Sequence, residues 1–306
     1  MRMRATAAAL SGALALTAFA LPAVQAVAAP SKPAPAGDAA SAARAAHQAD
    51  LRKATAAHRE AAPSLGARAV PDDGSGDTAV SDIVVNGGKD VVLGTTNTKH
   101  VTVTFTVTDN SGVEYANAIL WHGGPTFEDV DTGVLPDGEQ AVCTETSATT
   151  ANCKLTYTID PRQHLFNDAA GTWKVAMTAV GNDGDFTDRD NAKTFAMKRY
   201  SKLTVNASPE PVKKGKTLTI TGKLTRANWD TSKYAGYTKQ PVKLQSRPAS
   251  GGSYATLKTY TSGSGSSAGV VKTTRTAGKD TCWRYSFAGT STTPAVTSTG
   301  DCVDVR

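Results

Sequence analysis

The sequence lacks the residue spacings by which metal sites and catalytic centres are usually recognised. Its four cysteines and five histidines form no C-x-x-C pair and no H-E-x-x-H run. The only match to a nucleophile motif, 265–269 with Ser267 at its centre, lies in a Gly/Ser-rich stretch without the strand-to-helix turn that this motif requires. We therefore predict a protein that is not an enzyme and that needs no cofactor, with calcium as the one candidate ion.

The sequence has only one long apolar run, and it lies near the start. Arg2 and Arg4 precede an apolar run over 5–21, which small residues follow. This order predicts a signal peptide over 1–28, and the run is too short to span a membrane. The pair of adjacent arginines that marks twin-arginine export is missing, and so is a cysteine near the cleavage region that could carry a lipid anchor. We expect a secreted protein, extracellular or loosely associated with the cell wall, without a membrane span.

Residues 29–78 are rich in alanine and proline and have hardly any large apolar side chains. Such a segment cannot bury enough apolar surface to fold, so we predict a disordered leader there. The alternative interpretation is a pro-segment or spacer that must be removed or stretched before the protein acts.

Downstream of residue 78 the pattern changes to short alternating strands separated by turns. Apolar residues alternate with polar ones over 101–107, 155–159 and 172–180, and the turn-forming stretches DNSG and GNDGD occupy 109–112 and 181–185. Regularly spaced short strands of this kind favour a β-sandwich.

A second set of strand patterns begins near residue 200. It includes 202–207, 217–225 and 241–247, and it closes with CWRYSFAG at 282–289, whose aromatic residues share one face. We predict an all-β protein with two Ig-like β-sandwich domains in tandem, over 79–199 and 200–306.

The even number of cysteines fits an oxidising compartment. Three pairings are formally possible. We favour Cys143 with Cys153 and Cys282 with Cys302, because each pair then falls inside one predicted domain.

Charge separates sharply between the two predicted domains. Residues 79–199 contain nine basic and sixteen acidic side chains, a net charge of −7, whereas 200–306 contain sixteen and five, a net charge of +11. A basic module is suited to an anionic partner, so we predict contacts with an anionic cell-wall polymer, or with another extracellular protein. The alternatives are that the two halves attract each other, or that the cations keep edge strands soluble.

The densest group of cations predicts where such a polymer would bind. Lys213, Lys214 and Lys216 surround one turn, and Trp229 lies in a loop with two tyrosines that could add an aromatic contact. Aromatic residues do not alternate with these lysines, so nucleic acid is not the expected partner.

Acidic loops of the first predicted domain are candidates for calcium. The stretch 181–191 carries four carboxylates, and a second acidic stretch lies at 127–133. Clustered loop carboxylates can supply the oxygen ligands that calcium requires, although neither stretch fits the EF-hand template. The candidate ligands in 181–191 are Asp183, Asp185, Asp188 and Asp190. The alternative is that these are solvated turn carboxylates.

Parts of the sequence resemble a known family. LTVNASPEPVKKGKTLTITGKLTRANW at 203–229 and WRYSFAGTSTTPAV at 283–296 resemble a module found repeatedly in secreted actinobacterial proteins. NGGKDVVLGTT at 86–96, ILWHGG at 119–124 and GTWKVAM at 171–177 resemble its companion domain, a family of unknown function. The resemblance implies secreted Ig-like modules without catalytic residues, and some members are labelled calcium-binding.

Together these patterns predict a secreted, non-enzymatic binding or structural module. Its basic second half would contact an anionic polymer. The alternative is a calcium-binding structural protein that uses acidic loops of the first half.

Overall fold

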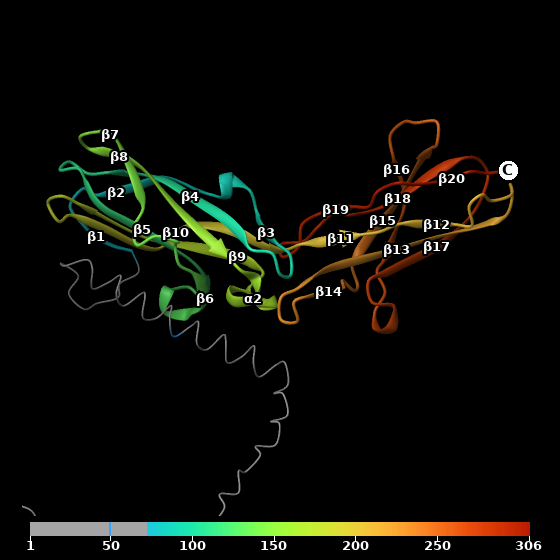
Figure 1. The fold of residues 1–306 in the computed structure, drawn as a ribbon, viewed down its shortest axis with the longest axis horizontal. Coiled ribbons are helices and arrows are strands. Elements are labelled where there is room, and N and C mark those ends of the chain that lie inside the picture. Colours follow the sequence, from blue (N-terminus) through green and yellow to red (C-terminus); the bar gives the residue numbers. More distant parts are fainter. Residues whose placement is uncertain (1–48, 50–71) are drawn as a thin grey trace, which may run out of the picture. The chain divides into compact units, whose positions relative to one another are not determined.

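The computed structural model describes Ala49 and residues 72–306. The predicted signal peptide, 1–28, and most of the predicted leader, 29–78, lie outside the described residues. No helix in the described part of the chain is long and apolar enough to cross a membrane. Nearly all regular elements are strands in antiparallel sheets (Figure 1), which confirms the predicted all-β class.

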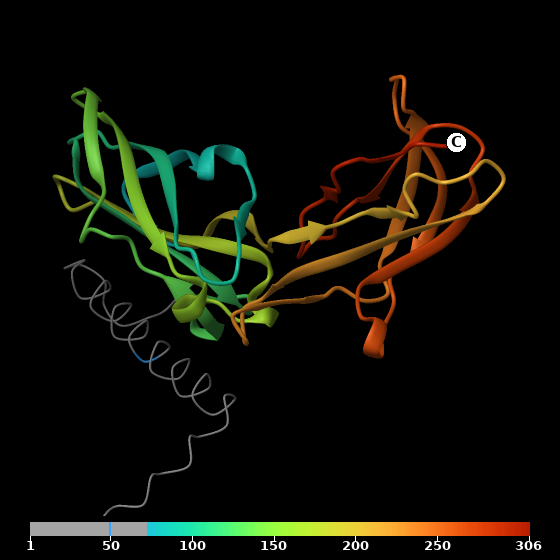
Figure 2. The same cartoon turned by 45° about the vertical axis from the view of Figure 1, so that its right-hand side comes forward.

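The strands β1 to β10 form two sheets, which we call the first sandwich. One sheet has the order β1-β10-β9-β5-β6, with β3 parallel to β10, and the other has the order β2-β4-β8-β7. Figure 2 shows these strands from a second direction, in cyan to yellow-green. Their bounds are β1 Asp73–Ser75, β2 Ala79–Val85, β3 Val91–Leu93, β4 Lys99–Thr108, β5 Val113–Gly123, β6 Val130–Val134, β7 Val142–Ser147, β8 Thr150–Ile159, β9 Gly171–Gly181 and β10 Phe186–Arg199, with a short helix α2 at Pro161–His164.

Alternation along the strands explains the core of the first sandwich. In β4 the side chains of Val101, Val103 and Phe105 are buried, while the threonines between them are less buried. In β9, Trp173 is fully buried and its indole N–H donates to the carbonyl of Ala169 at 2.7 Å. Because successive strand residues point to opposite faces, one face of each sheet supplies the core, as predicted from the sequence.

The strands β11 to β20 form the second sandwich. One sheet has the order β11-β13-β12, with β14 and β17 also paired to β13, and the other has the order β16-β15-β18-β19, with β20 also paired to β18. Their bounds are β11 Ser201–Leu203, β12 Asn206–Ser208, β13 Thr217–Asn228, β14 Lys233–Gly236, β15 Pro241–Pro248, β16 Ala255–Thr261, β17 Val270–Thr276, β18 Thr281–Phe287, β19 Val296–Thr297 and β20 Asp301–Val303.

The closing strand β18 supplies the aromatic core of the second sandwich. Trp283, Tyr285 and Phe287 are all buried, and the Tyr285 hydroxyl donates to the carbonyl of Ile220 at 3.1 Å. The aromatic face predicted for this stretch is therefore confirmed.

Both favoured disulfides are present. Cys143 is bonded to Cys153, and Cys282 is bonded to Cys302. In each pair the two residues lie directly opposite one another on neighbouring antiparallel strands, which are β7 with β8 and β18 with β20.

The last residues of the predicted leader belong to the folded part of the chain. Residues 73–75 form β1, which pairs with 186–188 of β10, and Thr78 is buried. The predicted leader over 29–78 therefore extends too far at its C-terminal end. The start of the folded region is hard to recognise in the sequence, because a strand of three residues is too short to show a pattern of alternation.

The predicted division at 199/200 falls between two strands, since β10 ends at Arg199 and β11 begins at Ser201. However, Ala227 and Trp229, at and just after the end of β13, pack in the core cluster of the first sandwich. The extent of each domain as an independently folding unit stays a prediction.

Candidate functional sites

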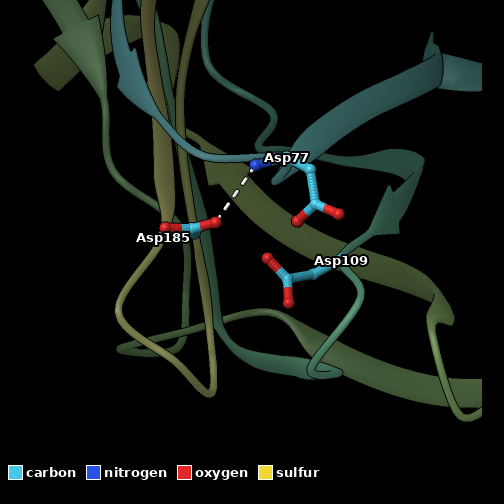
Figure 3. Close-up of side chains that lie close together, drawn as sticks. All are labelled: Asp77, Asp109 and Asp185. Carbon is cyan, nitrogen blue, oxygen red and sulfur yellow. Dashed lines mark hydrogen bonds between the residues drawn. The ribbon is translucent and has the colours of Figure 1, made fainter.

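Three carboxylates from separate connections meet beside the strands of the first sandwich. Asp77 lies between β1 and β2, Asp109 directly follows β4, and Asp185 directly precedes β10. One carboxylate oxygen of each lies within 4.8 Å of the other two (Figure 3). We call these three residues the aspartate cluster. Its side chains are separated by up to 108 positions in the sequence.

Hydrogen bonds hold the carboxylate of Asp109 in its charged form. This residue is only 2% exposed, and its two oxygens accept from the hydroxyls of Thr78 and Ser111, each at 2.5 Å, and from the Ser111 backbone N–H at 2.8 Å. Burial by itself would raise the pKa of Asp109, but these hydrogen bonds hold that pKa below its ordinary value. The cluster therefore has a charged carboxylate at its buried side.

The other two aspartates are tied together through the backbone. The Asp77 N–H donates to Asp185 Oδ2 at 3.1 Å, shown by the dashed line in Figure 3. An Asp77 carboxylate oxygen accepts from the Asn110 N–H at 3.4 Å, so it reaches the turn that follows Asp109.

Two glycines allow the carboxylates to lie against the backbone. At Gly76, which has a φ of +74°, a Cβ atom would lie 1.6 Å from Asp185 Oδ2. At Gly181 a Cβ atom would lie 2.1 Å from Asp109 Oδ2. Only glycine leaves room for a carboxylate at these two positions. These two glycines therefore have a role in packing, which could not be inferred from their positions in turns.

The four aspartates predicted as calcium ligands do not converge. Only Asp185 joins the aspartate cluster; Asp183 accepts from the Asp185 N–H and stabilises the turn. Asp188 accepts from the Thr178 hydroxyl, and Asp190 accepts from the Phe127 N–H at 3.0 Å. The predicted residue set is therefore corrected. Asp188 and Asp190 lie in a strand, whose alternation and extension carry their side chains to other partners.

The lysines predicted to bind polymer lie on one turn of the second sandwich. Lys213, Lys214 and Lys216 are all exposed, between β12 and β13. The Gly215 N–H donates to the carbonyl of Ala277 at 2.7 Å, and the Ala277 N–H donates to the carbonyl of Lys216 at 2.8 Å. This turn is thereby held beside the connection between β17 and β18.

A cleft of about 410 Å³ opens beside the lysine turn. Its lining includes Ala277, which contacts the turn, together with Lys279, Arg247 and Trp283. Serine and threonine residues contribute further polar groups to the lining. We call the cleft and five nearby cations the basic end: Lys279 and Arg247 line the cleft, and Lys213, Lys214 and Lys216 lie on the adjoining turn.

Acidic side chains near the basic end are engaged elsewhere. Asp280 accepts from the Val305 N–H at 2.8 Å, and Asp304 pairs with Arg306 at 3.0 Å. Among the described residues, no carboxylate forms an ion pair with the cations of the basic end. The charge density of the sequence identifies the lysine turn but not Lys279 and Arg247, because tertiary contacts bring these two residues there.

Trp229 does not belong to a binding surface. It is 2% exposed, packs in the core of the first sandwich, and donates its indole N–H to the carbonyl of Gly94 at 2.8 Å. Its predicted role in polymer binding is therefore wrong. The polar neighbours of Trp229 suggest an exposed loop, but Asn228 and Asp230 both accept hydrogen bonds from Asn167. Asn167 Oδ1 in turn accepts from the Trp229 N–H at 3.0 Å, so this set of bonds anchors the tryptophan.

Comparison with known proteins gives a partial family match. The model of a family of unknown function (DUF5707) matches residues 93–179, within the first sandwich and less than half of the chain. This agrees in part with the predicted resemblance to a family of unknown function. No curated protein matches the sequence.

Several solved structures have remotely similar chain traces. Dimeric latent PorU from Porphyromonas gingivalis is 10% identical, with a TM-score of 0.25; the match covers 79% of this chain and 21% of that one. Dpr11 IG1 bound to DIP-gamma IG+IG2 is 11% identical, with a TM-score of 0.25 and coverage of 76% and 100%. The amphioxus IgVJ-C2 molecule is 8% identical, with a TM-score of 0.23 and coverage of 70% and 99%. Similarities this low support no inference about binding or activity.

Proposed function

We propose that the protein is a secreted, non-enzymatic module that binds an anionic polymer outside the cell through its basic end. The observation that carries this proposal is that two cations line the cleft and three more lie on the adjoining turn, without carboxylate ion-pair partners among the described residues. Like charges held together raise the local positive potential, which attracts a polyanion. The two disulfides support an extracellular location, because such bonds persist in oxidising compartments.

The cleft gives the basic end a specific shape in addition to its charge. Its volume of about 410 Å³ is in the range that holds one small group of a ligand, and Trp283 gives its wall an apolar face. A polymer of sugar or polyol units that carry phosphate or carboxylate groups fits both features. Its charged groups would contact the lysines, and one unit would enter the cleft.

Salt-dependent binding tests the proposal. The affinity of the secreted chain for a poly(glycerol phosphate) polymer would be measured by calorimetry from 50 to 300 mM NaCl, with neutral dextran as the comparison polymer. Each cation that neutralises a phosphate adds roughly 0.7 to 0.9 to the slope of log affinity against log salt. Because that slope is negative, replacing Lys213, Lys214 and Lys216 by alanine should reduce its magnitude by about 2 to 3.

A matched variant separates local binding from overall charge. Lys223, Lys233 and Lys272 are exposed lysines outside the basic end, and their replacement by alanine removes the same charge from the second sandwich. This control should keep most of the slope. Equal losses in both triple variants would show that the basic end is not the binding site, and binding of dextran at the same strength would refute the anionic selectivity.

A second candidate function is calcium binding in the first sandwich. The aspartate cluster brings three carboxylates together, and calcium prefers oxygen ligands of this kind. The lowered pKa of Asp109 supports this role, because a cation ligand must be deprotonated. In this proposal calcium would link the ends of three connections and thereby stabilise the fold.

Thermal unfolding tests the calcium proposal. A ligand that binds only the folded state raises its stability. Millimolar calcium should raise the Tm relative to EDTA, and Asp185→Asn should remove most of that rise. Asp82→Asn, at an exposed carboxylate of β2, is the control that should keep it. No rise, or an equal rise with magnesium and with NaCl of the same ionic strength, would contradict a calcium site.

A further inference from the structure

One buried indole N–H of the second sandwich has no acceptor. Trp283, in β18, is 8% exposed, and its Nε1 forms no hydrogen bond with any group of the described chain. The only other buried side-chain nitrogen or oxygen without a partner in this part of the chain is Arg275 Nε, and that guanidinium is bonded to the Tyr260 hydroxyl through Nη2 at 3.4 Å. An indole N–H can only donate, and most buried tryptophans find an acceptor for it. The unpaired donor of Trp283 therefore needs an explanation.

The other three tryptophans of the sequence have the ordinary arrangement, in which the indole N–H donates to a backbone carbonyl. Trp121 donates to Asp190, Trp173 to Ala169 and Trp229 to Gly94, at 2.7 to 2.8 Å. Trp283 instead lines the cleft of about 410 Å³ at the basic end. An acceptor for its N–H has to come from outside the folded chain, and the cleft is the opening that this residue lines.

The buried part of the cleft lining is apolar and uncharged. Leu218, Ala277 and Val303 line the cleft together with Trp283, and each is no more than 5% exposed. A charged group placed against such a wall would lose its hydration without gaining an ion partner. A neutral group that has both C–H surface and an oxygen acceptor suits this part of the cleft better.

The charged and hydroxyl groups of the lining are more accessible. Lys279, Ser253 and Thr276 line the same cleft and are all exposed, and Arg247 is half-buried. Hydroxyls can both donate and accept, so they can bond further hydroxyls of a ligand. The lining therefore has a buried part for a neutral unit and an exposed part for polar and anionic groups.

We propose that the cleft holds one neutral sugar or polyol unit, and that a hydroxyl oxygen of this unit accepts a hydrogen bond from Trp283 Nε1. The C–H groups of the unit lie against the apolar part of the lining. This inference rests on the proposed function, because the cleft belongs to the basic end. It assigns the neutral units of the polymer to the cleft and its anionic groups to the cations. A sugar and a polyol share this hydroxyl chemistry, so the experiment uses both.

NMR of the full chain with isotope-labelled tryptophan tests the inference, because each of the four tryptophans gives one indole N–H signal. Methyl glucoside, ribitol and inorganic phosphate would be titrated separately at constant ionic strength. We expect a saturable downfield shift of the Trp283 signal with one or both neutral probes, while the other three signals stay in place because protein carbonyls already accept from those groups. A shift with phosphate alone would make the cleft a phosphate site and overturn the inference. No shift with any probe would mean that the donor binds water only, and would also overturn it.

Trp283→Phe keeps an aromatic ring but removes the donor, and it also identifies the Trp283 signal by its loss. Calorimetry should show that it binds the neutral probe roughly two- to tenfold more weakly, because one neutral hydrogen bond is lost. Trp121→Phe is the matched control, since it removes an indole N–H that a protein carbonyl already accepts, and it should bind the probe unchanged. Circular dichroism confirms that each variant is folded, and the titration of the unchanged chain depends on neither. Equal losses in both variants would contradict the role of Trp283.

The polymer itself separates this inference from the proposed function. Salt-dependent binding of poly(glycerol phosphate) that leaves the Trp283 signal in place would support the basic end as an anion site and overturn the assignment of the cleft. A shift with a neutral probe in a chain that does not bind the polymer would keep the sugar or polyol site and refute the proposed function. The triple alanine variant at Lys213, Lys214 and Lys216 should therefore bind the polymer more weakly and still show the full Trp283 shift with the neutral probe.

Discussion

Replacing Trp229 by alanine should destabilise the first sandwich, although this residue follows strands of the second. The side chain is 2% exposed and packs in the first core, so its truncation leaves a large cavity. Removal of a buried tryptophan costs about 3–5 kcal/mol of unfolding free energy. Loss of the hydrogen bond to Gly94 adds about 1 kcal/mol. Trp229→Phe keeps most of the volume and should cost about 1–2 kcal/mol.

Urea unfolding monitored by circular dichroism would measure these losses, and hydrogen exchange would locate them. We expect faster exchange in peptides from 93–179 as well as in those around Trp229. Leu257→Ala, at a side chain that is 48% exposed in β16, is the control and should change stability by less than about 0.5 kcal/mol. A loss below about 1 kcal/mol in Trp229→Ala, or faster exchange only within 200–306, would refute the reasoning.

A disulfide, a buried carboxylate and a turn glycine each give a further prediction. Cys282→Ala combined with Cys302→Ala opens a loop of 20 residues and should cost about 3 kcal/mol in urea unfolding under the chain-entropy model; an unchanged midpoint would contradict it. Asp109→Asn should cost about 1.5–3 kcal/mol at pH 7. Because the folded-state pKa of Asp109 is lowered, its contribution is present above about pH 4 and is lost as pH falls further, so the two proteins should converge in acid. Gly76→Ala should lower Tm more than Gly184→Ala, since both have positive φ but only Gly76 has a carboxylate against it; equal shifts would point to backbone strain alone.

Much of the fold follows from short-range patterns that can be recognised in the sequence. The alternation in 101–107 and 282–289 identifies the inward faces of these strands, because a strand has only two faces. Cys282 is the exception, since it lies on the opposite face from Tyr285 and is nevertheless buried. The disulfides could be assigned for a related reason, since each pair is close in sequence and lies within one predicted domain. The start of the folded region was less predictable, because β1 is stabilised mainly by its pairing with β10.

The candidate sites were only partly predictable. The lysine turn could be found from three closely spaced charges, but the cleft beside it depends on residues that are distant in the sequence, among them Arg247 and Lys279. The aspartate cluster was harder to predict from the sequence than the lysine turn. Asp185 could be recognised within an acidic stretch, whereas Asp77 and Asp109 could not, because each is a single carboxylate in its own turn.

The sequence by itself determined the all-β class, the inward face of each main strand, the disulfide pairs and the contrast in charge between the two halves. These properties depend on composition and on a two-residue period, both of which are local. Only the tertiary structure decided that Trp229 is a core residue and that Asp77, Asp109 and Asp185 share one place. Each of these depends on which turns and strand ends meet, and that is settled by the packing of whole sheets rather than by neighbouring residues.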